Sequence, residues 1–432
     1  MLIQLKTLSY KVVLLSMVVG LLGFTIALAA SGDLDTTFSG DGRVITNFGP
    51  SPGRVDELSG IAIQPNGKII AVGFSSGDFA LTRYNVDGSL DTTFSGDGKV
   101  TTNFGGYDTA RDIALQSNGK IVVSGQKSTV DRDVALARYN ANGTLDTSFS
   151  DDGKQSTEFG GDNGSEGGLA IQSNGKIVMA GYAWNHNSTD KEFAIYRYNP
   201  NGSIDLTFTG DGVAIGNFGV NQFDVTRDLA IQSDGKIVVV GESGSNESAE
   251  DFDFAIARLN PNGTADLTFS GDGRQRTNFG GLDTVSSVAV GPNGKIVVVG
   301  YRVPPLNNNR TEIAVVRYNP NGSLDTTFNG TGRKAFSING SLASFAKDVI
   351  VQSDGKIVLL ADTNGDLVLV RLNSNGSFDT TFHGDGKVIV DFGAVEWASA
   401  LARQPSDGKY VIGGQTNAGT PQSDFALARV LP

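Results

Sequence analysis

The sequence predicts an all-β protein, a seven-bladed β-propeller with four antiparallel strands in each blade. Two markers each recur seven times along the 432 residues. A Gly-Lys step before a short apolar run returns every 52 to 61 residues, at Gly67, Gly119, Gly175, Gly235, Gly294, Gly355 and Gly408. The phenylalanine that ends Leu-Asp-Thr-Thr-Phe and its variants stands at Phe38, Phe94, Phe149, Phe208, Phe269, Phe328 and Phe382. Self-similarity at such a period is typical of propellers and other repeat architectures.

Each repeat contains two predicted hairpins. In the second repeat, residues 112–116 and 121–125 are rich in β-branched residues and are joined by Ser-Asn-Gly, which favours a tight turn. Residues 134–139 and 144–149 flank Asn-Ala-Asn-Gly and form the second hairpin. Four antiparallel strands make one propeller blade. A further stretch, such as residues 99–104, follows each fourth strand, and the sequence leaves open whether it extends that strand or forms a rim strand.

The alternative fold is a β-solenoid. Its coils usually repeat at about 20 to 30 residues, so the longer unit here favours a four-stranded blade. Helical periodicity is absent after residue 30, and the 57 glycines suit a chain dense in turns.

Residues 1–30 have the order of a secretory signal peptide. Lys6 and Lys11 precede the apolar run 12–28, and small residues including Ala29 and Ala30 follow it. An uncleaved membrane anchor is the alternative, because the run approaches the ~18 residues that span a bilayer. No stop-transfer charges follow it, so we expect cleavage near Ala29 or Ala30 and a mature domain of residues 31–432 that is extracellular or periplasmic.

Composition excludes several classes of function. Cleavage would remove two lysines and no acid, which makes the formal charge of -12 still more negative. Such a field repels nucleic acid and anionic membrane surfaces, so neither is an expected partner of the mature form, which we expect to be a monomer. The chain has no cysteine, and His186 and His383 are its only imidazoles, so thiol and Ser-His-Asp catalysis are not expected.

Three spaced motifs carry a resemblance to a known family. Asp-Gly-Lys-Ile-Val-Val-x-Gly, Phe-Ala-Leu-x-Arg-Tyr-Asn and Asn-Gly-Ser-Leu-Asp-Thr-Thr-Phe recur in order, with variants, across residues 33–431. In this the chain resembles the bacterial delta-sixty repeat family. The resemblance implies a bacterial, exported, propeller-type protein whose biochemical role is uncharacterised.

A Gly-rich loop with spaced carboxylates is the candidate cation site. The pattern Asp-x-Thr-Phe-x-Gly-Asp-Gly places one acid per repeat on such a loop, and a hard cation takes oxygen ligands of this kind. Thr331 replaces the acid in the sixth repeat, and the spacing is not that of an EF-hand. Asp-Gly is also an ordinary turn signal, and this is the favoured interpretation. The acids concerned are Asp41, Asp97, Asp152, Asp211, Asp272 and Asp385.

One loop carries candidate ligand-binding residues. Tyr182, Trp184 and His186 stand in the connection between the second and third strands of the third repeat. They can stack on a sugar or a peptide, or simply pack over the edge of the blade.

Arginine and aspartate recur eight residues apart around the second hairpin. Counting outward from the turn places the two side chains opposite each other in a pair worth about 0.2–1 kcal/mol. Asp35 has no arginine before it and Arg429 has no aspartate after it. We therefore predict that residues 34–38 supply the fourth strand of the last blade, beside residues 425–430, and that both termini close the ring. The internal pairs are Arg83 with Asp91, Arg138 with Asp146, Arg197 with Asp205, Arg258 with Asp266, Arg317 with Asp325, and Arg371 with Asp379.

Loop variation predicts where function lies. The turns between first and second and between third and fourth strands are nearly constant, whereas the connections on the opposite face vary in length and chemistry. Variable loops on a rigid scaffold are typical of recognition, so we expect a non-enzymatic protein that binds a protein, peptide or glycan and needs no cofactor.

Two alternatives stay open. One is a hydrolase or lactonase with a metal in the central channel, which needs polar ligands on the first strands. Those strands read Ile-Ala-Ile-Gln at residues 61–64 and similarly elsewhere, so small and apolar channel residues are expected instead. The other alternative is a structural protein stiffened by calcium.

Overall fold

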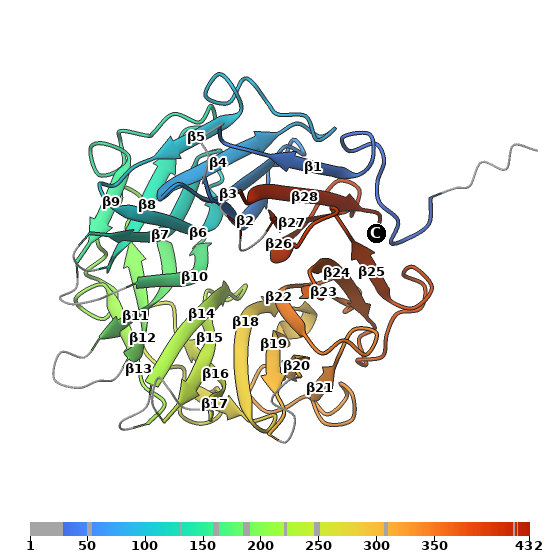
Figure 1. The fold of residues 1–432 in the computed structure, drawn as a ribbon. Helices are drawn as coiled ribbons and strands as arrows, with labels where there is room; N and C mark the ends of the chain where they lie inside the picture. Colours follow the sequence, from blue (N-terminus) through green and yellow to red (C-terminus); the bar gives the residue numbers. More distant parts are fainter. Residues whose placement is uncertain are drawn as a thin grey trace, which may run out of the picture.

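A computed structural model describes residues 29–49, 54–129, 132–158, 164–184, 191–219, 223–245, 251–305, 310–417, 420 and 422–432. Within these residues, 28 strands form seven four-stranded antiparallel sheets arranged as a ring (Figure 1). The predicted seven-bladed β-propeller is therefore confirmed. The predicted signal peptide, residues 1–30, lies almost wholly outside the described residues. Among the described residues, no helix has the length and apolarity that crossing a membrane requires.

The blades follow one another along the chain, and only the last combines both ends of it. The bounds of the strands are as follows. Blade 1 contains β2 (Asp56–Ile63), β3 (Ile69–Ser75), β4 (Asp78–Tyr84) and β5 (Lys99–Thr102); blade 2 contains β6 (Tyr107–Leu115), β7 (Ile121–Ser128), β8 (Arg132–Tyr139) and β9 (Lys154–Thr157); blade 3 contains β10 (Gly164–Ile171), β11 (Ile177–Trp184), β12 (Lys191–Tyr198) and β13 (Val213–Gly216); blade 4 contains β14 (Phe223–Ile231), β15 (Ile237–Gly244), β16 (Asp253–Leu259) and β17 (Arg274–Thr277). Blade 5 contains β18 (Leu282–Val290), β19 (Ile296–Val303), β20 (Glu312–Tyr318) and β21 (Arg333–Phe336), with the 3-10 turn η1 (Pro292–Gly294) between its first two strands; blade 6 contains β22 (Ser344–Val351), β23 (Ile357–Thr363), β24 (Asp366–Leu372) and β25 (Lys387–Val390); blade 7 contains β26 (Trp397–Arg403), β27 (Tyr410–Thr416), β28 (Asp424–Val430) and β1 (Arg43–Thr46).

The first hairpin of each blade is closed by a tight turn, as its turn sequence predicts. In blade 2, Gly119 has a φ of 83°, in the left-handed region that glycine occupies without steric cost. The amide of Gln116 donates to the carbonyl of Lys120, which closes the turn. The side chain of Asn118 accepts the amide of Lys120 at 3.1 Å and fixes the loop from inside.

The fourth strand is not where the sequence placed it, so this part of the prediction was wrong. Residues 144–149 make a single bridge, between Tyr139 and Leu145, and then turn. Asp146 stops the strand because its carboxylate accepts the amide and hydroxyl of Ser148 while its carbonyl accepts the amide of Phe149. The stretch that follows, β9, pairs with β8 instead. The segment left open in the sequence is thus the true fourth strand of each blade.

The apolar core lies between adjacent blades. One buried cluster joins Val72 of blade 1 to Val123 of blade 2, and another joins Val299 of blade 5 to Leu359 of blade 6. Such clusters follow one another around the ring. The first strand of each blade contacts the first strand of the next, so these seven strands line the centre.

Both ends of the chain close the ring in blade 7. β1 pairs antiparallel with β28, from Arg43 opposite Ala428 to Thr46 opposite Phe425 (Figure 1). Leu34 adds one bridge to Val430, and the Nε of Arg429 donates to Asp35 Oδ2 at 2.6 Å. Residues 34–38 were expected to supply the closing strand. They make the ion pair, whereas the strand itself comes from β1, a few residues later.

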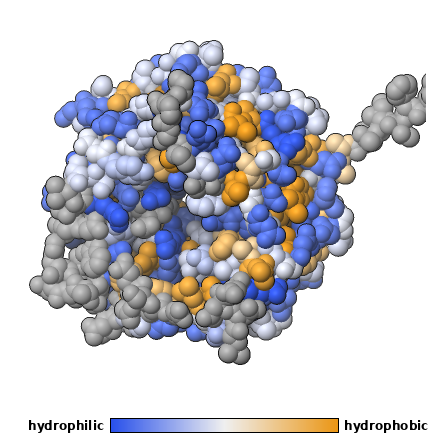
Figure 2. All heavy atoms as spheres, viewed as in Figure 1, coloured by the Kyte–Doolittle hydropathy of each residue, from blue (hydrophilic) through white to orange (hydrophobic). Residues whose placement is uncertain are grey.

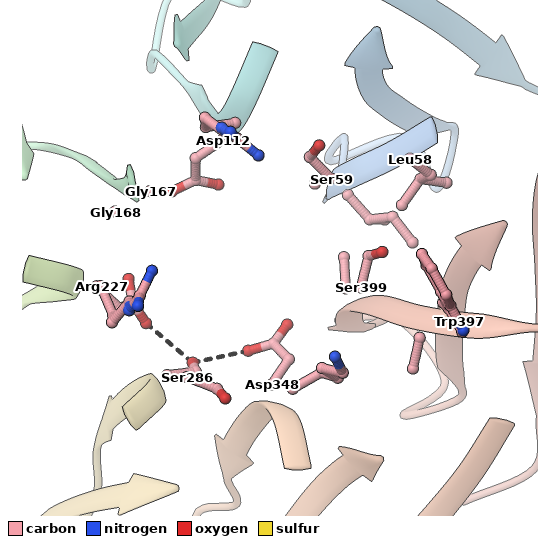
Figure 3. A pocket seen from close by; sticks show the side chains of 18 of the residues that line it. Leu58, Ser59, Asp112, Gly167, Gly168, Arg227, Ser286, Asp348, Trp397 and Ser399 are labelled. Atoms are coloured by element: carbon pink, nitrogen blue, oxygen red, sulfur yellow. Dashed lines mark hydrogen bonds between the residues drawn. The ribbon is translucent and has the colours of Figure 1, made fainter. Parts of the chain in front are cut away.

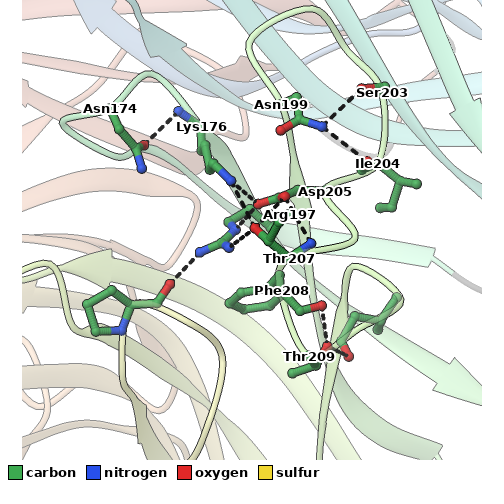
Figure 4. A network of polar contacts seen from close by, with 12 residues as sticks. Asn174, Lys176, Arg197, Asn199, Ser203, Ile204, Asp205, Thr207, Phe208 and Thr209 are labelled. Carbon is green, nitrogen blue, oxygen red and sulfur yellow. Dashed lines mark hydrogen bonds and ion pairs between the residues drawn. The ribbon is translucent and has the colours of Figure 1, made fainter.

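All seven arginine-aspartate pairs adopt one geometry. The arginine Nε lies 2.6–2.7 Å from the aspartate Oδ2, and the arginine Cζ lies 4.4–5.0 Å from the centre of a phenylalanine ring. Figure 4 shows the pair of blade 3, in which Lys176 and Thr207 also contact Asp205. Arg197 further donates to the carbonyl of Pro261 in the next blade. Each pair therefore joins a strand, a turn and a neighbouring blade.

These pairs are buried, which changes their energetic weight. The side chain of Arg197 is 6% exposed and that of Asp205 is 2% exposed. The value of about 0.2–1 kcal/mol applies to ion pairs at the surface. Removing one residue of a buried pair costs more, because the charge of the other residue stays buried without compensation. Burial alone would raise the pKa of Asp35, but hydrogen bonds from Thr37 and Lys409 and the charge of Arg429 lower it to about 2.

Candidate functional site

The centre of the ring holds a pocket of about 520 Å³. Figure 2 shows it as a hollow bordered mainly by hydrophilic residues. Its lining comes from the first strand of every blade, mostly from the middle of that strand, and from Gln415 of β27. Trp397, the first residue of β26, and Gln415, near the end of β27, also line it, so the pocket extends toward the face that the sequence marks as variable.

A β-bulge in each innermost strand shapes the lining. The pairing of β6 with β7 shifts between Ala110 and Asp112, which leaves Arg111 as an extra residue, and the pairing of β14 with β15 shifts in the same way around Arg227. A bulge redirects a side chain that regular alternation would bury or turn away. The extra residues of the seven blades, all of which line the pocket, are Ser59, Arg111, Gly168, Arg227, Ser286, Lys347 and Ser399.

The chemistry of the bulges alternates around the ring. Blades 2, 4 and 6 carry a basic residue followed by aspartate, whereas blades 1, 5 and 7 carry two small residues and blade 3 has Gly167 and Gly168 at this place. Figure 3 shows Asp112, Arg227 and Asp348 around the open centre of the pocket. The expectation of small and apolar residues around the channel holds for blades 1, 3, 5 and 7 and was wrong for blades 2, 4 and 6, which place a basic residue and an aspartate in the lining. It rested on residues such as 61–64, which follow the bulge and of which only Ile61 lines the pocket. The signal that was missed is Arg-Asp or Lys-Asp directly before the apolar run in alternate repeats.

Each channel aspartate connects its blade to the next. Asp112 accepts the amide of Leu169 at 2.6 Å, and Asp348 accepts the amide of Leu401 at 2.7 Å. Asp228 accepts the amide of Val288 at 2.9 Å. The other oxygen of each aspartate accepts the amide of the residue that follows it. Both oxygens are thus engaged, so these aspartates act as links between inner strands rather than as free metal ligands.

Burial raises the pKa of all three channel aspartates. The pKa of Asp112 rises to about 7 and that of Asp348 to about 6. Asp228 reaches about 8, because the negative charges of Asp112 and Asp348 add to the effect of burial. The hydroxyl of Ser287 lies 2.9 Å from both Asp228 and Asp348, yet it has one hydrogen to donate. If Asp228 carries a proton, its carboxyl donates to the hydroxyl of Ser287, and the hydroxyl can then donate to Asp348.

These shifts predict that stability falls as pH rises. A carboxyl whose pKa is raised by folding contributes its full stabilisation below pH 3.8, its pKa in the unfolded chain. This contribution is lost as the pH rises through the pKa of the folded protein. We therefore expect the melting temperature to decline between about pH 5 and pH 8. Asp228→Asn removes the group with the highest value, and its decline should be shallower. Thermal unfolding of both proteins at four pH values tests this, and parallel curves would contradict it.

The basic pocket residues have acidic neighbours. Arg227 Nε donates to Glu242 Oε1 at 2.8 Å, and Lys347 Nζ lies 3.4 Å from Asp362 Oδ2. The charge of Arg111 acts on Glu57, whose pKa is raised by burial and lowered by that charge. Trp397 also lines the pocket and is 49% exposed. The pocket therefore offers donors, acceptors and one accessible aromatic face.

The six aspartates considered as cation ligands do not lie together at one site. Each lies exposed in its own blade, and its carboxylate accepts the amide two residues later, as Asp41 does from Arg43 at 2.9 Å and Asp211 from Val213 at 3.0 Å. Thr331 makes the same contact to Arg333 with its hydroxyl, at 3.3 Å. The four remaining acids, Asp97, Asp152, Asp272 and Asp385, repeat this geometry.

The candidate binding loop is described only at its start. The side chain of Tyr182 is fully buried, with the Nζ of Lys191 4.5 Å from the centre of its ring, so it offers no open face to a ligand. Trp184 ends β11, but its side chain and all of His186 lie outside the described residues. His383 stands on an exposed turn, with Nδ1 3.5 Å from Asp33, and does not line the pocket.

Several solved structures similar to this chain are named as lyases. A catalytically inactive virginiamycin B lyase from Staphylococcus aureus, solved with quinupristin, has a TM-score of 0.52 and 12% identity over 89% of this chain and 98% of its own. Polysaccharide lyase Uly1 has a TM-score of 0.52 and 12% identity over 89% and 91%. An ulvan lyase of a new polysaccharide lyase family has 0.51 and 13% over 93% and 94%. At these identities the likeness shows the fold alone.

The family comparison is more direct. No curated protein matches the chain. The model of a β-propeller domain of unknown function, DUF5122, matches seven segments, one in each repeat: residues 64–94, 116–149, 172–208, 232–269, 291–328, 352–382 and 406–432. The expectation of a propeller-type repeat family without an assigned role is confirmed, and the chain belongs to the DUF5122 β-propeller family.

Proposed function

We propose that this protein is an extracellular carbohydrate-binding propeller that takes a polar segment of a glycan into its central pocket. The observation that carries the proposal is the pocket itself, about 520 Å³ in volume and lined by bulged residues of all seven blades. A site of this size accepts a small ligand or the end of a longer one.

The chemistry of the lining favours a sugar over an apolar ligand. Sugar hydroxyls donate and accept hydrogen bonds, and the pocket offers donors at Arg111 and Lys347 and an acceptor at Glu57. The apolar face of a sugar ring stacks on an exposed aromatic side chain, and Trp397 stands at this position. The pocket also extends toward the variable connections, where recognition is expected on a rigid scaffold.

The alternative is an enzyme that acts in the same pocket. The channel carboxylates favour it, because raised pKa values are common at catalytic sites. Their hydrogen bonds to backbone amides give them a linking role instead, and among the described residues no histidine lines the pocket. Binding without turnover therefore accounts for more of the geometry.

A glycan array probed with residues 31–432 identifies ligands, and calorimetry on the best one tests the site. Trp397→Ala should weaken binding about tenfold or more, since it removes the stacking face. Tyr107→Ala is the matched control, because Tyr107 is a 57% exposed aromatic outside the pocket, and its affinity should stay within about twofold.

Three outcomes would overturn the proposal. One is the absence of any glycan bound at millimolar concentration. Another is an equal effect of Trp397→Ala and Tyr107→Ala. The third is release of a shortened or unsaturated product from the bound glycan, which would make the protein an enzyme.

A further inference from the structure

The residue that follows the first strand is glutamine in six blades and glycine in the fifth. Gly291 takes this place in blade 5, where its backbone is extended, with a φ of -90° and a ψ of -179°. Any residue adopts such a conformation, so the backbone does not require glycine here. The six glutamines are Gln64, Gln116, Gln172, Gln232, Gln352 and Gln404.

In blade 4 the glutamine covers a groove that lies between this blade and the next. Gln232 is 9% exposed, and its Oε1 lies 3.4 Å from Nη1 of Arg258. The groove has a volume of about 430 Å³ and is lined by polar residues, one glycine and Pro320. Among the described residues, its lining includes neither Val238 of β15 nor Ile296 of β19, which belong to the apolar core. Gln232 therefore separates this groove from the core.

The corresponding groove between blades 5 and 6 reaches the core. Its volume is about 400 Å³, and its lining includes Val297 and Ile357, the counterparts of the two core residues absent from the other groove. Val351 also lines it and is partly exposed. Because glycine has no side chain to cover these residues, the groove has an apolar floor. The tight turns of both blades border it, so it lies on the face opposite the variable connections.

Two cations beside this groove share one carboxylate. Arg317 and Lys295 line the groove, and both contact Asp325, with the Nε of Arg317 2.7 Å from Oδ2. Figure 4 shows the equivalent network of blade 3. Burial raises the pKa of Asp325, but hydrogen bonds from Lys295 and Thr327 and the charge of Arg317 outweigh it and hold this pKa below its usual range. The network therefore carries one positive charge in excess.

Arg317 has hydrogens left for a ligand. Its side chain is 8% exposed, Nη1 donates to the carbonyl of Ser374, and Nη2 donates to the hydroxyl of Thr327 at 3.0 Å. A guanidinium has five hydrogens, and Nε uses one on Asp325. Two hydrogens thus remain without an acceptor among the described residues. Other arginines of this set also have spare hydrogens, but in blade 5 the place of the glutamine side chain is open.

One acid belongs to the lining itself. Asp354 lies in an exposed turn, where its carboxylate accepts the amide of Lys356 at 3.0 Å. Water and salt screen a charge in such a position. The more buried part of the groove, beside Arg317, therefore stays positive.

We propose that the groove between blades 5 and 6 binds a small carboxylic acid with an apolar body. The carboxylate accepts hydrogen bonds from Arg317 and Lys295, and one of its oxygens takes the place that Gln232 Oε1 has in blade 4. The apolar body lies against Val351 and Pro292. A cavity of about 400 Å³ suits a ligand of this size. The central pocket is not involved, so this site is independent of glycan binding.

Saturation-transfer NMR on residues 31–432 with sodium benzoate and sodium hexanoate tests the proposal. Both acids should give saturable signals at millimolar concentration. Benzyl alcohol and hexan-1-ol keep the apolar body without the charge and should bind at least about tenfold more weakly. Gly291→Gln restores the residue of the other blades and should weaken binding of the acids by a similar factor. A Cβ at this position lies 2.8 Å from Val351 Cγ1, so the valine must shift, and a melting curve checks that the variant is folded.

Gly216→Gln is the matched control. Gly216 ends β13 in blade 3, and a Cβ there meets only Phe193, at 3.4 Å, so affinity for the acids should stay within about twofold.

Gln232→Gly makes the opposite change and should open a second site, between blades 4 and 5. Crystals soaked with 4-bromobenzoate locate the sites by the anomalous scattering of bromine. The unaltered protein should show one peak, between blades 5 and 6, and Gln232→Gly should show two. If Gly291→Gln does not fold, the second peak decides the question. The proposal is overturned if neither acid binds, if folded Gly291→Gln binds them as tightly, if the alcohols bind equally well, or if bromine lies only elsewhere.

Discussion

Deleting residues 31–46 should open the ring and cause aggregation. The deletion removes β1, the fourth strand of blade 7, and leaves β28 as an unpaired edge. It also removes Asp35, so Arg429 and Lys409 lose their shared carboxylate. Phe38 leaves the cluster that joins blade 7 to blade 1. We expect the cooperative unfolding transition at the original temperature to disappear, as measured by calorimetry and light scattering.

A shorter deletion separates the contributions of the ion pair and the strand. Removing residues 31–39 takes away Asp35 and Phe38 but keeps β1, so the protein should fold with a marked loss of stability. Removing only residues 1–30 should change nothing in the folded domain. A melting temperature that is the same for all three proteins would refute closure by the two termini.

Asp205→Ala should destabilise the protein by about 3–5 kcal/mol. Arg197 is buried and would keep its charge without the carboxylate that compensates it. Lys176 and Thr207 would lose the same partner (Figure 4). Urea unfolding, followed by tryptophan fluorescence and circular dichroism, measures the change in the free energy of unfolding.

The control for this substitution lies in the same connection. Asp211→Ala removes an exposed acid that caps a turn through the amide of Val213, and its cost should stay below about 1 kcal/mol. Equal losses in the two variants would mean that the buried pair adds nothing beyond ordinary turn stability.

The sequence predicts the ring because its strongest signals are local and repeated. The first hairpin of blade 2 depends on Asn118 and Gly119, two residue types that indicate a tight turn in the sequence itself. The eight-residue interval between Arg197 and Asp205 also survives in the structure, because a hairpin bridge between Tyr198 and Ile204 holds the register.

The position of the fourth strand could not be predicted from the sequence in the same way. Residues 144–149 have the composition of a strand, and propensity alone does not reveal that the side chain of Asp146 will bond to the backbone two residues on. The short β9 has few apolar residues, since it forms the outer edge of the blade. Its pairing depends on tertiary contacts.

The pocket was missed for a different reason. Strand alternation assigns one face to each residue, and a bulge breaks that alternation without a fixed sequence signature. Arg111 and Asp112 therefore looked like the polar start of a strand rather than part of a central site.

The bulges separate the specificity of the pocket from the stability of the ring. Each one is an extra residue outside the regular ladder, so exchanging Ser59 or Ser399 for another residue changes what the pocket presents without removing an interstrand hydrogen bond. The aspartates that link the inner strands allow no such freedom. Gene duplication of a blade would thus yield a scaffold in which a few single-residue changes alter which ligand binds. A designer could exchange bulge residues between blades for the same purpose.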